Sequence, residues 1–172
     1  MTTPADVASA LAAFPVVLRT LLEPLDPATL TVRPEPGEWS VHEVIGHLIA
    51  TDTDAFQHRI QSILDGNSEI PGFHPWAAID ARDFNAVTLA ELLAEFDASR
   101  TQMVPFVAAL SAEQTALTAE YPGFGSFTAG DFVAEWPFHD HEHLQQILDI
   151  TKASYLPSMG EAMRTALTRP DG

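Results

Sequence analysis

Helix-start signals recur at four places in this chain, and they constrain its fold more than any other feature. The segments Ser40–Glu43 and Thr88–Glu91 are capping boxes, in which a Ser or Thr precedes a Glu by three residues. Thr3 and Thr128 are N-cap candidates, each followed three residues later by an Asp. Strand signals are nearly absent, because no alternating run of β-branched residues exceeds four positions. The pattern therefore predicts an all-α protein.

Apolar residues at helical spacing follow each of these starts. The expected helices span residues 4–22, 41–65, 89–110 and 129–150, with a short turn at 111–117 and a weaker last helix at 158–167. Four long amphipathic helices with mostly short links predict a four-helix bundle, in a single domain over residues 1–172. Pro15 and Pro137 fall inside two of these helices. We expect a kink at each, or a fourth helix that becomes regular only near Pro137.

Composition excludes several classes of partner. The chain has 8 Lys and Arg against 24 Asp and Glu, a formal charge of −16, which disfavours binding to nucleic acids and to anionic membranes. No stretch approaches 18 uninterrupted apolar residues, and the N-terminus lacks the pattern of a signal peptide. We therefore expect a cytoplasmic protein without a membrane span. The absence of cysteine leaves histidines and carboxylates as the available ligands for a transition metal.

A cluster of histidines is the strongest chemical signal. His139, His141 and His143 lie within five residues, and the first and last of them share one face of a helix. Such a pair chelates a divalent metal when a third ligand completes the site, and His47 is the best candidate for that ligand. Asp54 follows on nearly the same face of its helix as His47. Three nitrogen ligands with an open position describe a catalytic metal site.

Other interpretations of these residues stay open. The histidine pair is also compatible with a solvated helix surface. His139, Glu142 and His143 match the inverted zinc-protease motif, although only 29 residues follow for the further ligand that such enzymes need. His42 and His141 are expected on the surface or behind the ligands. His74 lies in a loop that we expect either to cover the site or simply to pack. His58 shares the face of His47, more than two turns away.

Two longer motifs resemble the DinB-like family of metal-binding bundles. They are the segment from Arg33 to Leu48, which contains Pro-Gly-Glu-Trp-Ser, and the segment from His139 to Ile147, a His-x-x-x-His followed by Leu-x-Gln-Ile. The resemblance runs from about Leu11 to Ile150. It implies an up-down-down-up four-helix bundle that holds a metal with His47, His139 and His143. It also implies thiol-dependent transferase or isomerase activity, as some family members have.

Together these observations predict a divalent-metal-dependent enzyme with a small-molecule substrate. The metal, zinc or nickel first and iron or manganese as alternatives, would activate water or a low-molecular-weight thiol. Asp54 and Gln146 are the candidate catalytic residues, as an acid or base and as a hydrogen-bonding group beside His143. The alternative function, outside the enzymes, is that of a non-catalytic bundle that binds metal or a partner. Outward-facing apolar residues on the first and third helices also leave a homodimer open.

Overall fold

Four long helices form the body of the molecule, which we describe from a computed structural model over residues 2–168. Their bounds are α1 Pro4–Leu22, α3 Val41–Thr51 continued by α4 His58–Leu64, α6 Leu89–Ala108, and α8 Ala129–Ala153. Each of the four expected starts carries a complete capping box, in which the cap side chain and the third helical residue satisfy each other's backbone N–H. The outer ends of the predicted domain, Met1 and 169–172, lie outside the described residues.

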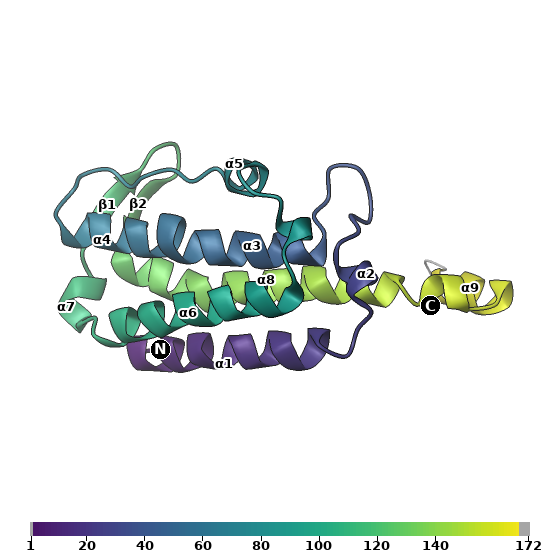
Figure 1. Ribbon diagram of the computed structural model, residues 1–172. Helices are drawn as coiled ribbons and strands as arrows, with labels where there is room; N and C mark the ends of the chain where they lie inside the picture. The colour runs from purple at the N-terminus through teal and green to yellow at the C-terminus, as the bar shows by residue number, and fades with distance from the viewer. Residues whose placement is uncertain (1, 169–172) are drawn as a thin grey trace.

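The helices run up, down, down and up, as predicted (Figure 1). α1 and α8 point one way, and α3–α4 and α6 point the other way. α6 and α8 each contact both α1 and α3, so α1 lies diagonally opposite α3. This topology needs one long connection between the two parallel neighbours, which is supplied by the segment between α4 and α6.

The core consists of two apolar clusters. One joins the start of α1, α4, the end of α6 and the start of α8, and the other joins the opposite halves of α1, α6 and α8 with α3. α1 is long and apolar enough to pass a length-and-composition test for a membrane span. Its residues Leu11, Leu18 and Leu22 are fully buried between α6 and α8, which is the environment of a bundle core helix.

Several short elements decorate the bundle. The sequence predicted no strands, and this was wrong for one hairpin: β1 Thr118–Tyr121 pairs antiparallel with β2 Gly125–Thr128. The expected turn after α6 contains α7 Ala112–Thr115, and the expected last helix is α9 Glu161–Thr168. The remaining short helices are α2 Pro27–Leu30, α5 Pro75–Asp80 and the 3₁₀ turns η2 Phe84–Ala86 and η3 Leu156–Ser158.

The prolines do not divide the helices. Pro15, Pro105 and Pro137 lie inside α1, α6 and α8, each of which is continuous. The expectation that the fourth helix becomes regular only near Pro137 was wrong, because α8 begins at Ala129. One irregularity was not expected. Between α3 and α4 the chain forms a π-helical turn, η1 Asp52–Gln57.

Candidate metal centre

The structure brings together three histidines from two helices that lie side by side. His47 is on α3, and His139 and His143 are one turn apart on α8. α3 is fixed at its start because Ser40 and Glu43 cap each other, and Arg33 binds the Glu43 carboxylate through Nε at 2.9 Å. The motif that precedes His47 thus anchors the helix that carries it.

The three side chains converge through their Nε2 atoms. His139 Nε2 lies 3.1 Å from His47 Nε2 and 3.2 Å from His143 Nε2, and the ligand atoms of all three lie within 4.8 Å of one another. Nitrogens bound at about 2.0–2.1 Å in a tetrahedral zinc site lie roughly 3.3–3.4 Å apart. The two distances from His139 Nε2 are close to this value, and all three ligand atoms are near enough to one another to share one small divalent ion.

Burial keeps these imidazoles neutral, as metal ligation requires. The pKa of His47 is lowered to about 3, first by burial and then by the neighbouring His143. The pKa of His139 also falls to about 3, first through burial and then through the charges of His143 and His47. Burial lowers the pKa of His143, and its hydrogen bond to the Gln146 side-chain oxygen opposes this change. Neutral imidazoles offer lone pairs to a cation without competition from protons at neutral pH.

Gln146 orients one of the ligands. Its side-chain oxygen lies 2.8 Å from Nδ1 of His143, so this nitrogen donates its proton and Nε2 carries the lone pair. The Nδ1 atoms of His47 and His139 are buried and have no hydrogen-bond partner among the described residues. Those two rings are held by aromatic contacts instead. Trp39 lies 4.7 Å from His47, and Phe56 lies 5.3 Å from His139, between ring centroids.

The histidines line a cavity of about 380 Å³. Three aromatic side chains, Trp39, Phe56 and Phe73, form much of its wall, and two charged side chains, Arg59 and Glu135, reach it. Burial raises the pKa of Glu135, and the nearby charge of Arg59 opposes this change. The cavity therefore contains a candidate cation site, a carboxylate able to exchange a proton, and a fixed positive charge.

The π-helical turn decides which residues face this cavity. His47, Thr51, Ala55 and Arg59 all line it, at a constant spacing of four. A regular α-helix would rotate this row by about 40° at each step, and the wider π turn absorbs that drift. Asp54, predicted from regular helical spacing to face the site, is exposed and does not line the cavity.

The remaining histidines take no part in the cluster. His58, expected on the face of His47, is exposed for the same reason as Asp54. His42 is not a surface residue: it is 2% exposed, and its Nδ1 lies 3.3 Å from the Phe84 carbonyl oxygen. His141 is exposed and contacts the Pro137 carbonyl oxygen through Nδ1 at 2.6 Å. His74 is exposed too, although its neighbours Phe73 and Pro75 cover the metal cavity.

A buried ionic network behind the site was missed at the sequence level. Arg100 donates from Nε to Asp52 and forms a two-bond pair with Asp140, the residue next to His139. Ser99 and Trp136 also donate to Asp52, at 2.7 Å and 2.9 Å. Burial raises the pKa of Asp52 to about 6, against the opposing charge of Arg100. An Asp at the first position of a π turn and an Asp between two histidines gave no periodic signal of burial.

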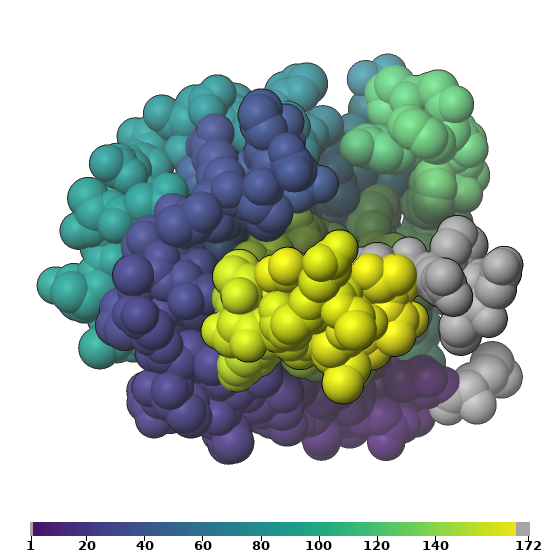
Figure 2. All heavy atoms as spheres, turned by 90° about the vertical axis from the view of Figure 1, so that its right-hand side faces the viewer, coloured from purple at the N-terminus to yellow at the C-terminus, as the bar shows by residue number. Residues whose placement is uncertain are grey.

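A larger groove adjoins the metal cavity at the end of the bundle. It has a volume of about 670 Å³ and shares Trp39 with the cavity. Its walls are the loop from Pro34 to Trp39, Trp76 of α5, and the second half of α8 from Glu142 to Ala153. Figure 2 looks onto this end, with the loop above the C-terminal segment and α8 visible between them.

Comparisons with known proteins agree with this arrangement. The sequence model of the DinB superfamily matches residues 10–147. Among solved structures, YfiT from Bacillus subtilis, described as a probable metal-dependent hydrolase with an unusual four-helix bundle topology, superimposes with a TM-score of 0.76. The two are 17% identical, over 88% of this chain and 87% of YfiT. No curated protein sequence matches the chain.

Proposed function

The chain belongs to the DinB superfamily, and on that premise we propose that it is a divalent-metal-dependent enzyme acting on a small molecule. The observation that carries the proposal is the convergence of three neutral imidazoles on the wall of a cavity, where the Nε2 atom of His139 lies 3.1 Å from that of His47 and 3.2 Å from that of His143. Zinc and nickel fit this donor set best, and iron and manganese are alternatives, because imidazole suits several of these ions.

A divalent ion in such a site lowers the pKa of a water or thiol toward neutrality and so supplies a nucleophile. The protein's own residues do the rest. Gln146 fixes the tautomer and orientation of His143. Trp39 and Phe73 restrict access of water, since their rings lie 4.7 Å and 6.1 Å from that of His47. Glu135 is the carboxylate placed to accept or return a proton in the cavity, a role that the sequence analysis gave to Asp54.

The nucleophile distinguishes two versions of the activity. YfiT is described as a probable hydrolase, which would use water. The resemblance at the motif level favours a low-molecular-weight thiol, and hence a thiol-dependent transferase or isomerase. The chain has no cysteine, so a thiol nucleophile has to arrive with a cosubstrate. We propose the thiol-dependent version, with a non-catalytic metal-binding bundle as the alternative from another class.

Metal analysis of the purified protein tests the site first. We expect one divalent ion per chain in the wild type, and loss of that ion in His47→Ala and His139→Ala. His74→Ala is the matched control, because it removes an exposed histidine beside the same cavity. Unchanged metal content in the two ligand variants would exclude the site.

Turnover then separates the two classes of function. The metal-loaded protein is incubated with a panel of electrophiles, with and without small thiols. Thiol-dependent conversion that is lost in His139→Ala, and reduced about 10²–10⁴-fold in Glu135→Gln, supports the proposal. Stoichiometric metal without any conversion supports the non-catalytic bundle.

A further inference from the structure

We propose that Arg59 forms a carboxylate-binding site inside the metal cavity, so that the small molecule bound there carries a carboxylate beside its reactive group. The inference rests on the proposed function, because it assigns a chemical class to the ligand of the same site. The experiment below separates failure of this inference from failure of the metal site itself.

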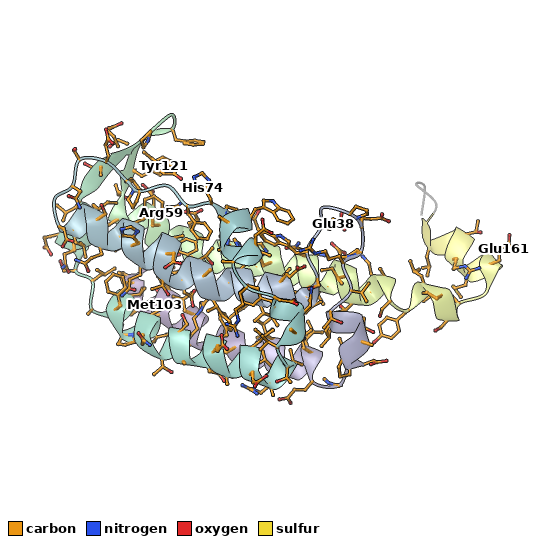
Figure 3. All side chains as sticks on the ribbon, turned by 45° about the horizontal axis from the view of Figure 1, so that its top comes forward. Glu38, Arg59, His74, Met103, Tyr121 and Glu161 are labelled. Atoms are coloured by element: carbon orange, nitrogen blue, oxygen red, sulfur yellow. The ribbon has the colours of Figure 1, made fainter. Side chains whose placement is uncertain are left out.

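The guanidinium of Arg59 is held in a fixed position by three parts of the chain. Arg59 lies on α4, and its Nη2 donates to the Tyr121 hydroxyl of β1 at 3.1 Å. Its Nε donates to the Pro71 carbonyl oxygen of the connecting segment at 3.4 Å. The guanidinium carbon also lies 5.2 Å from the ring centroid of Tyr121 and 5.6 Å from that of Phe132. Figure 3 shows Arg59 and Tyr121 close to each other at the hairpin end of the bundle. A guanidinium fixed in this way loses little freedom when it binds a ligand.

Arg59 has binding capacity left over. The two bonds to Tyr121 and Pro71 use fewer N–H groups than a guanidinium offers. Arg19, Arg33, Arg82 and Arg100 each form an ion pair with a carboxylate. Arg59 forms none within the described part of the chain, although acidic residues outnumber basic ones by 24 to 8. Its charge is felt by Glu135 in the same cavity lining but no ion pair between them is formed, so the free N–H groups of Arg59 are placed to receive an anion from outside.

The charge of the cavity also favours an anion. The three histidines are neutral, so they cancel none of the charge of a divalent ion. Arg59 is the only Lys or Arg among the described residues that line the cavity. Glu135 is the one carboxylate among them. With a divalent ion bound, the cavity is positive inside a chain of charge −16. A carboxylate on the ligand would form charge-assisted hydrogen bonds with Arg59 in this partly buried space.

The competing explanation is that Arg59 only ties the hairpin to α4. If Arg59 had only this structural role, its removal would weaken the binding of all ligands equally. If it binds carboxylates, its removal would weaken only the binding of ligands that carry a negative charge. Three small thiols of similar size provide this comparison: mercaptoacetate is anionic, 2-mercaptoethanol is neutral and cysteamine is cationic. Cobalt(II)-loaded protein reports thiolate binding through its visible absorption.

We expect Arg59→Met to weaken mercaptoacetate binding roughly ten- to a hundredfold, the effect of losing a hydrogen bond to a charged group. Binding of 2-mercaptoethanol should change by no more than about twofold. Arg82→Met is the matched control, because it removes one positive charge that is paired with Glu95 away from the cavity. Equal weakening of all three thiols, or no change for mercaptoacetate, would overturn the carboxylate site.

A second measurement does not depend on metal or thiol. Ligand-observed nuclear magnetic resonance of the metal-free protein compares acetate with its neutral analogue acetamide. A signal for acetate that disappears in Arg59→Met supports the inference even if no cobalt or thiol binds, an outcome that would refute the proposed metal chemistry alone. Equal signals in wild type and variant, or none in either, would refute the carboxylate site.

Discussion

Arg100 on α6 and Asp140 on α8 face each other through two parallel hydrogen bonds of 2.7 Å and 2.6 Å, and neither side chain is more than 3% exposed. Asp52 binds the remaining edge of the same guanidinium, through Nε at 2.9 Å. One arginine thus serves two buried carboxylates from different helices. Arg100 contacts the rings of Phe96 and Trp136, one from each apolar cluster, and Asp140 is next to His139 in the chain, so the network connects the core to the turn of α8 that carries His139.

Replacing Arg100 by Met should destabilise the protein by about 3–5 kcal/mol, because it leaves two buried carboxylates facing each other without a cation. Urea denaturation gives the free energy of unfolding. Arg82→Met is the control, since it breaks the partly exposed pair with Glu95 and should cost at most about 1 kcal/mol. If the two variants lose equal stability, the buried network does not contribute as described.

Metal-free protein should lose stability as the pH falls from about 6.5 toward 3. His47 and His139 have pKa values of about 3 when folded, against an ordinary value of 6.5. Between these values the unfolded chain binds more protons, so the free energy of unfolding falls as acid is added. Asp52 acts in the opposite direction between pH 3.8 and about 6, because its folded pKa is raised.

The histidine contribution is isolated by comparison with His139→Leu. Urea denaturation of both proteins, with a chelator present, is repeated at intervals from pH 7 to pH 4. The variant lacks one of the depressed groups, so its free energy of unfolding should depend less steeply on pH. Parallel curves would show that the pKa of His139 is not depressed by folding.

Changing Gln146 to Leu should weaken metal binding by about 10- to 100-fold, because His143 Nδ1 loses the acceptor that fixes its tautomer. Competition with a chromophoric chelator measures the affinity. Gln145→Leu is the neighbouring control, since Gln145 is exposed and bonds to Asp149. Equal affinities in the two variants would remove Gln146 from the site.

Gly46 to Ala should destabilise the protein by about 1–3 kcal/mol through overpacking. A Cβ at Gly46 would lie 2.5 Å from atoms of the Phe84 ring, which packs on α3 just before His47. Thermal and urea unfolding measure the loss. Gly72→Ala, with open space around it, is the control. Phe84→Ala should restore part of the loss in the double variant, and strict additivity would contradict the contact.

The bundle and the histidine cluster were predictable because their signals are local. The capping boxes at Ser40, Thr88 and Thr128 depend on residues three apart, and each of the three helices begins there. His139 and His143 share a helix face by spacing alone. His47 was a candidate because it lies inside an amphipathic helix, and the resemblance to a family strengthened that assignment, since nothing in the spacing of residues 92 apart brings two helices together.

The features that were missed depend on contacts across the fold. Each strand of the hairpin is four residues long and mostly exposed, so the inside–outside alternation that marks a strand is hardly present. Burial of Asp52 depends on Arg100, which is far away in the sequence. The placement of Asp54 and Arg59 depends on the π turn, which regular helical spacing does not describe.

In the π turn between α3 and α4, each residue advances about the helix axis by a smaller angle than it would in an α-helix. The helix upstream, which carries His47, begins at its own capping box at Ser40 and Glu43. Insertion or loss of a single residue at the start of this turn would therefore turn the residues that follow, including Ala55 and Arg59, away from the cavity while His47 kept its place. A change in the length of this turn would thus alter the residues that line the cavity without moving the histidines, and the cavity would then select a different small molecule.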